Sequence, residues 1–167
     1  MIDSLKPIKL VAIVGPTAVG KTSLAVRIAS EIPCEVVSAD SRQIYCGMDI
    51  GTAKPSLQEL LKVRHHLINV VSPDQVLSLP QYLELARQAI EDITQRGKLP
   101  LLVGGTGQYI RALLEGWMVP EVAANLELRA ELFAVAEQRG AEALHNRLKE
   151  VDPQAAARID YRNVRRV

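Results

Sequence analysis

The fold is decided by one stretch, IKLVAIVGPTAVGKTSLAVRIASEI, which covers residues 8–32. Residues 8–14 form an apolar run with one lysine, which is typical of a strand buried on both faces of a parallel sheet. Glycines interrupt the run, and apolar residues then recur at helical spacing as far as Pro33, at Leu24, Ile28 and Ile32. The stretch therefore predicts a strand, a glycine-rich turn and a helix in direct succession.

The alternation of strand and helix continues to about residue 115. We expect further strands at 35–39, 66–71 and 99–103, and helices at 56–63, 80–96 and 108–115. Ser56 is expected to cap a helix and Gly97 to end one. After Gly116 only charged helical patterns follow, at 126–138, 141–150 and 153–159. This order predicts a parallel α/β sheet with flanking helices in residues 1–117 and a helical region in 118–167.

The composition excludes several classes of protein. The chain has 167 residues, 48% of them hydrophobic and 23% charged, with a net charge of +1, so nucleic acid could bind only through a local basic patch. Two cysteines, Cys34 and Cys46, favour reduced thiols over a disulfide scaffold. No apolar run approaches the ~20 residues that a membrane span needs. We also find no signal-peptide pattern, and expect a cytoplasmic protein without a membrane partner.

Residues 15–22 match the phosphate-loop pattern G-x-x-x-x-G-K-[ST] in full, between a buried strand and a helix. Backbone N–H groups and the helix N-terminus would face an anion, and the lysine would add a point charge. The threonine hydroxyl is placed to meet Mg²⁺, the expected cofactor. The pattern predicts a P-loop NTPase-like fold that binds a nucleotide or another diphosphate ester through Gly15, Pro16, Thr17, Ala18, Val19, Gly20, Lys21 and Thr22.

A second stretch, SADSRQIYCGMDIGTAKP at residues 38–55, follows the second expected strand. Asp40 stands where that strand ends, at the sheet edge where ligands of α/β proteins bind. The other buried strand ends in Gly104-Gly105-Thr106-Gly107 and supplies no acid. From position alone, Asp40 could hold a metal, accept a proton from a nucleophile, or cap a turn.

These two stretches, with HHLI at 65–68 and LLVGGTGQY at 101–109, closely resemble the tRNA dimethylallyltransferase family. Further matches in family order run to the final RRV, and the resemblance covers the whole chain. It implies transfer of a dimethylallyl group from dimethylallyl diphosphate to N6 of an adenosine beside the tRNA anticodon, at position 37, with release of diphosphate.

The resemblance also implies a role for individual residues. The loop at 15–22 would hold the diphosphate, and Asp40 would be the general base for the N6 amine. Contacts with tRNA are implied for Asp40, Ser41, Arg42, Gln43, Thr106, Arg129, Arg165 and Arg166. The helical region at 118–167 would be the start of a tRNA-binding insertion domain, and the full-length protein would be a monomer.

Members of the resembled family are far longer than this chain, so we expect an incomplete sheet here, as in a truncated or partial chain. Residues 9–14 should then form a strand with an open edge, and the isolated chain should be poorly stable and nearly inactive. The alternatives left open are an adenylate prenyltransferase, a P-loop small-molecule or nucleoside kinase, and a non-catalytic tRNA-binding remnant. His65 and His66 should point to opposite faces of a strand and act structurally, and Trp117 should pack at the domain junction.

Overall fold

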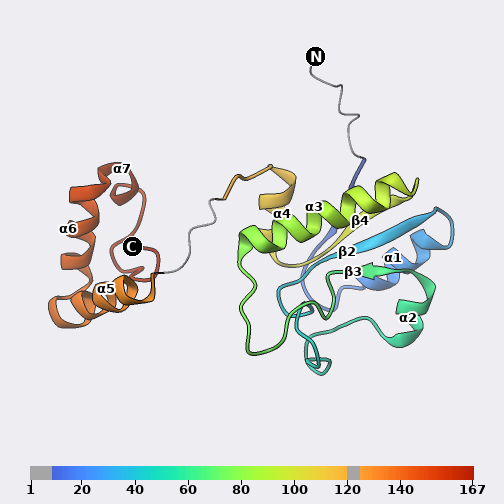
Figure 1. The fold of residues 1–167 in the computed structure, drawn as a ribbon, viewed down its shortest axis with the longest axis horizontal. Coiled ribbons are helices and arrows are strands. Elements are labelled where there is room, and N and C mark those ends of the chain that lie inside the picture. The colour runs from blue at the N-terminus through green and yellow to red at the C-terminus, as the bar shows by residue number, and fades with distance from the viewer. Residues whose placement is uncertain (1–8, 120–124) are drawn as a thin grey trace, which may run out of the picture. The chain divides into compact units, whose positions relative to one another are not determined.

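A computed structural model of the chain describes residues 9–119 and 125–167 (Figure 1). The chain splits into two compact units, Met1–Pro120 and Glu121–Val167, which are described separately below. Ile8, the start of the first expected strand, lies outside the described residues. The expected boundary between residues 117 and 118 lies just before the undescribed residues 120–124.

The first unit is built on a sheet of four parallel strands in the order β1-β4-β2-β3. The strands are β1 (Val11–Val14), β2 (Cys34–Ala39), β3 (His65–His66) and β4 (Leu99–Gly104). β4 lies between β1 and β2, and its register pairs Gly104 with both Val14 and Ala39. The parallel α/β prediction is therefore confirmed, and three strands end together at one edge of the sheet.

Helices cover both faces of this sheet (Figure 1). The helices α1 (Lys21–Ala29) and α2 (Leu57–Lys62) pack together, with α1 also against the strands, whereas α3 (Leu79–Gln95) and α4 (Gly107–Leu114) pack on the opposite side. The larger core lies under α3, where Tyr82 stacks on Tyr109 with ring centroids 3.8 Å apart. The Tyr82 hydroxyl donates to the carbonyl oxygen of Ser38, which ties α3 to the C-terminal part of β2.

The ends of the helices follow their sequence signals. The Ser56 hydroxyl accepts from the backbone N–H of Glu59, whose carboxylate accepts in return from the Ser56 N–H, so the predicted cap is a capping box. Gly97 has a φ of 71° directly after α3, as expected of a helix-end glycine. Trp117 packs against the core beyond α4, as predicted, and its indole N–H donates to Glu115.

The expectation that the first strand is buried on both faces is wrong for this chain. β1 is an edge strand, and Val11 and Val14 are 42% and 56% exposed. Among the described residues, β1 is paired with one strand, β4, along one edge. On its face, α1 packs only partly against it. The predicted open edge is thereby confirmed for Val11–Val14.

The strand expected at 66–71 is also wrong in its extent. Ladder pairing stops at His66, because Leu67 and Asn69 have φ values of 62° and 56°, which no strand residue adopts. An isolated parallel bridge between Tyr45 and Val71 resumes the pairing further along. β3 is therefore short, and the chain turns away at the edge of the site described below.

The second unit is helical, with α5 (Leu126–Arg139), α6 (Ala141–Val151) and α7 (Pro153–Ala156). α7 is shorter than the predicted 153–159, because the chain continues in turns from Ala157. His145 on α6 holds this turn region through contacts of 3.1 and 3.0 Å between its Nε2 and the carbonyl oxygens of Ala156 and Ile159. No helix among the described residues is long and apolar enough to span a bilayer.

Candidate active site

The carboxyl ends of β1, β4 and β2 bring three separate parts of the sequence together. The glycine-rich loop at 15–20 follows β1, Asp40 follows β2, and Gly105 and Thr106 follow β4. The Thr106 N–H donates to the carbonyl oxygen of Ala39 over 3.0 Å, which closes the end of the strand pair. A Cβ on Gly104 would lie 2.2 Å from that same carbonyl oxygen, so only glycine fits there.

The loop at 15–20 turns sharply from β1 into α1. Gly15, Ala18 and Gly20 all have positive φ values, of 155°, 66° and 87°. Lys21 opens α1 and bends back over the loop, where its ammonium donates to the carbonyl oxygens of Gly15 and Pro16 over 3.0 and 2.6 Å. The cation therefore lies over the loop, beside the start of a helix, where an anion is stabilised.

A first cavity of about 320 Å³ opens beside this loop. One side is formed by loop and helix residues, including Lys21 and Thr22. The floor is apolar, with Val36 from β2 and Val103 from β4, and Asp40 stands at the end of the sheet. The cavity thus combines an anion-binding wall with an apolar floor, within the size range of small-ligand pockets.

A second cavity of about 380 Å³ also borders Asp40. Its lining is polar and includes Ser41, Arg42, Thr52 and Thr106. Asp40 and Thr17 line both cavities. The residue that follows β2 therefore contributes both to an anion-binding cavity and to a second, polar cavity.

Among the described residues, Asp40 has one hydrogen-bond partner: its Oδ1 accepts from the backbone N–H of Arg42 over 2.9 Å. This contact is the turn cap that the sequence left open as one alternative. It orients the carboxylate and occupies one lone pair of four, so the remaining lone pairs can accept a proton or a ligand hydrogen bond.

Two further residues from the predicted set hold the segment after Asp40. The Thr106 hydroxyl accepts from the Ser41 N–H over 2.9 Å and donates to the Ser41 hydroxyl over 3.3 Å. The Gln43 amide accepts from the Ser38 hydroxyl over 3.1 Å and donates to the carbonyl oxygen of Ala53 over 2.9 Å. The structure therefore brings Asp40, Ser41, Gln43 and Thr106 together, with the last three already engaged in protein contacts.

The two histidines of β3 lie in different surroundings, which agrees with the prediction that their rings point to opposite faces of the strand. His66 contacts Glu35 over 2.7 Å, whereas His65 lines the first cavity. A carbonyl oxygen can only accept, so the 2.8 Å contact of His65 Nδ1 with the Val63 oxygen fixes the proton on Nδ1 and leaves Nε2 as an acceptor. Burial lowers the pKa of His65, which keeps the ring neutral at pH 7.

Sequence reasoning missed two features near the site. Glu35 at the start of β2 is 2% exposed and receives hydrogen bonds from Arg96, Lys98 and His66. Lys54 lines the first cavity, yet its ammonium is fully engaged elsewhere. No local pattern signals either cluster, since the partners of Glu35 lie 31 to 63 residues away in the sequence.

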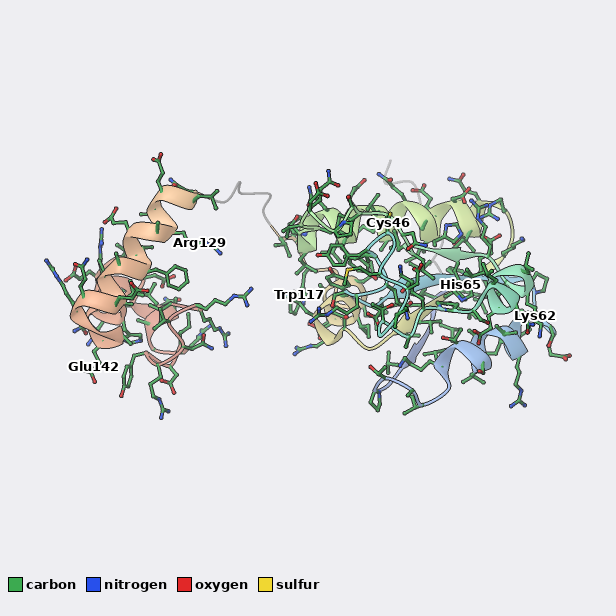
Figure 2. All side chains as sticks on the ribbon, turned by 90° about the horizontal axis from the view of Figure 1, so that it is seen from below. Cys46, Lys62, His65, Trp117, Arg129 and Glu142 are labelled. Atoms are coloured by element: carbon green, nitrogen blue, oxygen red, sulfur yellow. The ribbon has the colours of Figure 1, made fainter. Side chains whose placement is uncertain are left out.

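The remaining predicted residues belong to the second unit. Arg129 lies on α5 (Figure 2), and Arg165 and Arg166 lie in the turns that end the chain. Within the described residues, there is no cluster of three His, Cys, Asp or Glu side chains that could hold a metal ion.

Comparison with known proteins gives consistent results for almost the whole chain. A tRNA dimethylallyltransferase of Chloroflexus aurantiacus is 60% identical over 159 residues, which cover 95% of this chain and 54% of the relative. A tRNA dimethylallyltransferase of Roseiflexus castenholzii is 59% identical over 160 residues, covering 96% and 52%. The chain therefore spans about half the length of the curated relatives it matches.

Solved structures agree with the fold. A full-length tRNA isopentenylpyrophosphate transferase from Bacillus halodurans matches with a TM-score of 0.67 at 46% identity, covering 96% of this chain and 53% of that one. A eukaryotic dimethylallyltransferase, described as acting on tRNA, matches with a TM-score of 0.77 at 30% identity, covering 95% and 39%. The sequence model of the IPP transferase family matches residues 43–167. The chain belongs to the IPP transferase family.

Proposed function

We propose that the protein transfers a dimethylallyl group from dimethylallyl diphosphate to N6 of an adenosine next to the tRNA anticodon. The observation that supports the proposal is that Asp40 lines both cavities. Dimethylallyl diphosphate, bound by its diphosphate to the loop at 15–22, would have its allylic carbon near Asp40. An adenine entering from the second cavity would meet the carbon and the carboxylate together.

The chemistry needs these parts. An exocyclic adenine amine is a poor nucleophile, and a carboxylate that takes its proton as the N–C bond forms makes it a better one. The C–O bond to the diphosphate breaks at the same carbon, and the leaving group carries away the bonding electrons. Lys21 and the loop N–H groups would stabilise the negative charge that develops there. The apolar floor at Val36 and Val103 suits the hydrocarbon part of the donor.

We propose Mg²⁺ as the cofactor, held by the Thr22 hydroxyl and by the diphosphate itself. Thr22 lies in the first turn of α1 and lines the first cavity. One hydroxyl beside substrate phosphates suits this ion, which usually takes few protein ligands and keeps several waters. When bound, the ion would supply charge neutralisation for the leaving diphosphate.

Recognition of tRNA is proposed for both units. Ser41, Arg42 and Thr106 line the second cavity, where the target nucleotide would enter. Extruding a loop nucleotide costs less than extruding a paired one, which favours an anticodon-loop target. Arg129, Arg165 and Arg166 would contact phosphates from the second unit. We further propose that the full protein acts as a monomer and in the cytoplasm.

The test uses the 167-residue chain and a hybrid that continues it with the C-terminal half of the Chloroflexus aurantiacus relative. Each protein is incubated with dimethylallyl diphosphate, Mg²⁺ and unmodified tRNA, and the digested tRNA is analysed by mass spectrometry. We expect the hybrid to add one five-carbon group to the adenosine beside the anticodon, and the chain alone to be nearly inactive.

Three outcomes would overturn the proposal. A hybrid that binds diphosphate but leaves tRNA unmodified contradicts the reaction. Faster modification of AMP than of tRNA assigns the adenylate prenyltransferase activity instead. Transfer of the γ-phosphate of ATP to a small-molecule acceptor assigns the kinase activity.

A further inference from the structure

Lys54 lines the first cavity beside the proposed diphosphate site, so it looks like a second cation for the leaving group. Its contacts indicate otherwise. The Lys54 ammonium donates to the carbonyl oxygen of Tyr45 over 2.6 Å, to Asp49 Oδ1 over 2.8 Å and to Asn69 Oδ1 over 2.6 Å. An ammonium has three N–H donors, and all three are used. The Lys54 side chain is only 6% exposed. The residue lines the cavity, but its ammonium is bonded to protein groups and not directed at a ligand.

The partners of Lys54 belong to two segments. Tyr45 and Asp49 lie in residues 41–55, here called the strap, and Asn69 lies in the turn that follows β3. The first part of the strap runs beside that turn: the Asn69 N–H donates to the Gln43 oxygen, and the Val70 N–H donates to the Ile44 oxygen. Lys54 closes the other end of the strap onto the same turn. The strap and the turn are thereby joined into one piece.

Three residues with unusual backbone conformations lie where the strap meets the turn after β3. Ala53, Leu67 and Asn69 have φ values of 49°, 62° and 56°, a conformation that residues other than glycine rarely adopt. Such residues keep these values only where surrounding contacts hold them, and strain of this kind is concentrated at functional sites. Ala53 is adjacent to Lys54. Of the three, Asn69 is bonded directly by Lys54, through its side-chain oxygen.

The strap forms part of the wall of both cavities. Gln43, Ala53 and Pro55 face the first cavity, whereas Ser41, Arg42 and Thr52 face the second. A shift of the strap would therefore change the shape of the second cavity and the direction of the Asp40 carboxylate, which Arg42 holds. The phosphate loop would keep its shape, because it is built from β1 and α1.

We propose that Lys54 is a positioning residue: it locks the strap onto the turn after β3, shapes the acceptor side of the site, and does not bind the diphosphate. The part of this proposal that concerns acceptor binding rests on the proposed function. The part that concerns the strap and the diphosphate does not, so the two can fail separately.

The test compares Lys54→Met with two other variants, Lys21→Met and Lys62→Met. Lys62 is an exposed lysine at the end of α2, and its variant is the control for loss of a lysine away from the cavity (Figure 2). The first measurement is calorimetric binding of inorganic diphosphate with Mg²⁺ to the 167-residue chain. We expect Lys54→Met and Lys62→Met to bind within about twofold of the parent chain, and Lys21→Met to lose about tenfold or more, as expected for a charge-assisted contact. A loss in Lys54→Met equal to that in Lys21→Met would make Lys54 an anion ligand and overturn the proposal.

The second measurement is limited trypsin digestion, read as cleavage after Arg42 in the strap. Cleavage follows the population of the open segment, so we expect it to be about tenfold faster in Lys54→Met and unchanged in Lys62→Met. Asp49→Ala removes one exposed partner and should accelerate cleavage less, without loss of folding. It keeps the proposal testable even if Lys54→Met fails to fold. Unchanged cleavage in Asp49→Ala and in any folded Lys54→Met would show that Lys54 does not hold the strap.

The third measurement uses the hybrid enzyme with tRNA. We expect Lys54→Met to raise the KM for tRNA about tenfold while the KM for dimethylallyl diphosphate changes less than twofold. Lys54→Arg should recover little, because a planar guanidinium cannot present three donors to the same three acceptors as an ammonium does. An equal rise in both KM values would contradict an acceptor-side role.

Discussion

The strand β2 carries a carboxylate at each end, and the two ends work differently. Glu35, at the beginning, is buried and receives hydrogen bonds from three cationic or ionisable side chains: Arg96, Lys98 and His66. Asp40, just past the other end, has a single backbone contact and lines two cavities. A carboxylate surrounded by fixed donors stabilises the fold, whereas one with free lone pairs can do chemistry. The predictions below test this contrast.

The largest effect is expected for Asp40→Ala. Loss of a general base should lower the rate of prenyl transfer by the hybrid about 10²–10⁴-fold. Binding of diphosphate should change little, because the loop at 15–22 does not depend on the carboxylate. The measurement is single-turnover transfer together with the thermal midpoint. A variant with normal turnover would remove Asp40 from the proposed chemistry and break the contrast.

Gly104→Ala tests the same end of the sheet through its backbone. The added Cβ would lie 2.2 Å from the Ala39 oxygen, so β2 and β4 must separate where Asp40 is anchored. We expect a loss of about 3 kcal/mol or more in the free energy of unfolding, at the upper end for overpacking. Urea denaturation measures it. Gly107→Ala is the control, since nothing lies within 4 Å of its added Cβ.

Glu35→Gln tests the buried end. Removing one partner of a buried charge cluster leaves Arg96, Lys98 and His66 without their anion, and the cost is about 3 kcal/mol. The free energy of unfolding should fall by this amount at pH 7, while binding of diphosphate to the folded fraction stays the same. A loss of diphosphate binding with unchanged stability would reverse the roles of the two carboxylates.

The buried carboxylate also predicts a pH dependence. Hydrogen bonds from Arg96, above all, and from Lys98 and His66 hold the pKa of Glu35 well below its usual range. The stabilisation is therefore fully present above the unfolded pKa of about 4.3 and is lost as the pH falls from there toward the folded pKa. Urea midpoints between pH 7 and pH 3 should fall more steeply for the parent chain than for Glu35→Gln. Parallel slopes would contradict this.

The smallest effect is expected for Lys98→Met. Lys98 contacts Glu35 over 2.8 Å, but its side chain is 41% exposed, so water screens the pair. We expect a loss of about 0.5–1 kcal/mol in the free energy of unfolding, since two donors remain on Glu35. A loss as large as that of Glu35→Gln would show that Lys98 alone balances the buried charge.

Local patterns predicted one end of β2 better than the other. The phosphate loop, the position of Asp40 and the Ser56 cap follow from residues close together in the sequence, and the structure has them where the patterns indicated. The partners of Glu35 come from β3 and from the end of α3, so only the folded sheet brings them together. The same is true of Lys54 and Asn69, which are 15 residues apart.

Two strands show why a sequence pattern can predict a strand correctly but predict its burial or its length wrongly. The apolar run before Gly15 predicts a strand, but burial depends on the elements on either side, and β1 lies at an edge. The apolar residues after His66 favour a strand, but positive φ values at Leu67 and Asn69 end the ladder. The backbone at Asn69 and Val70 is bonded to Gln43 and Ile44, which lie more than 25 residues earlier and outside the local pattern.

Trp117 has a practical consequence. It is the single tryptophan of the chain, and it packs on the core of the first unit, with its indole N–H bonded to Glu115. Tryptophan emission excited selectively will therefore report on that unit, while far-ultraviolet circular dichroism records the helices of both. Denaturation curves that coincide by both methods would show that the two units melt together. Different midpoints would show that the two units unfold separately, and would allow the stability of each to be measured in the intact chain.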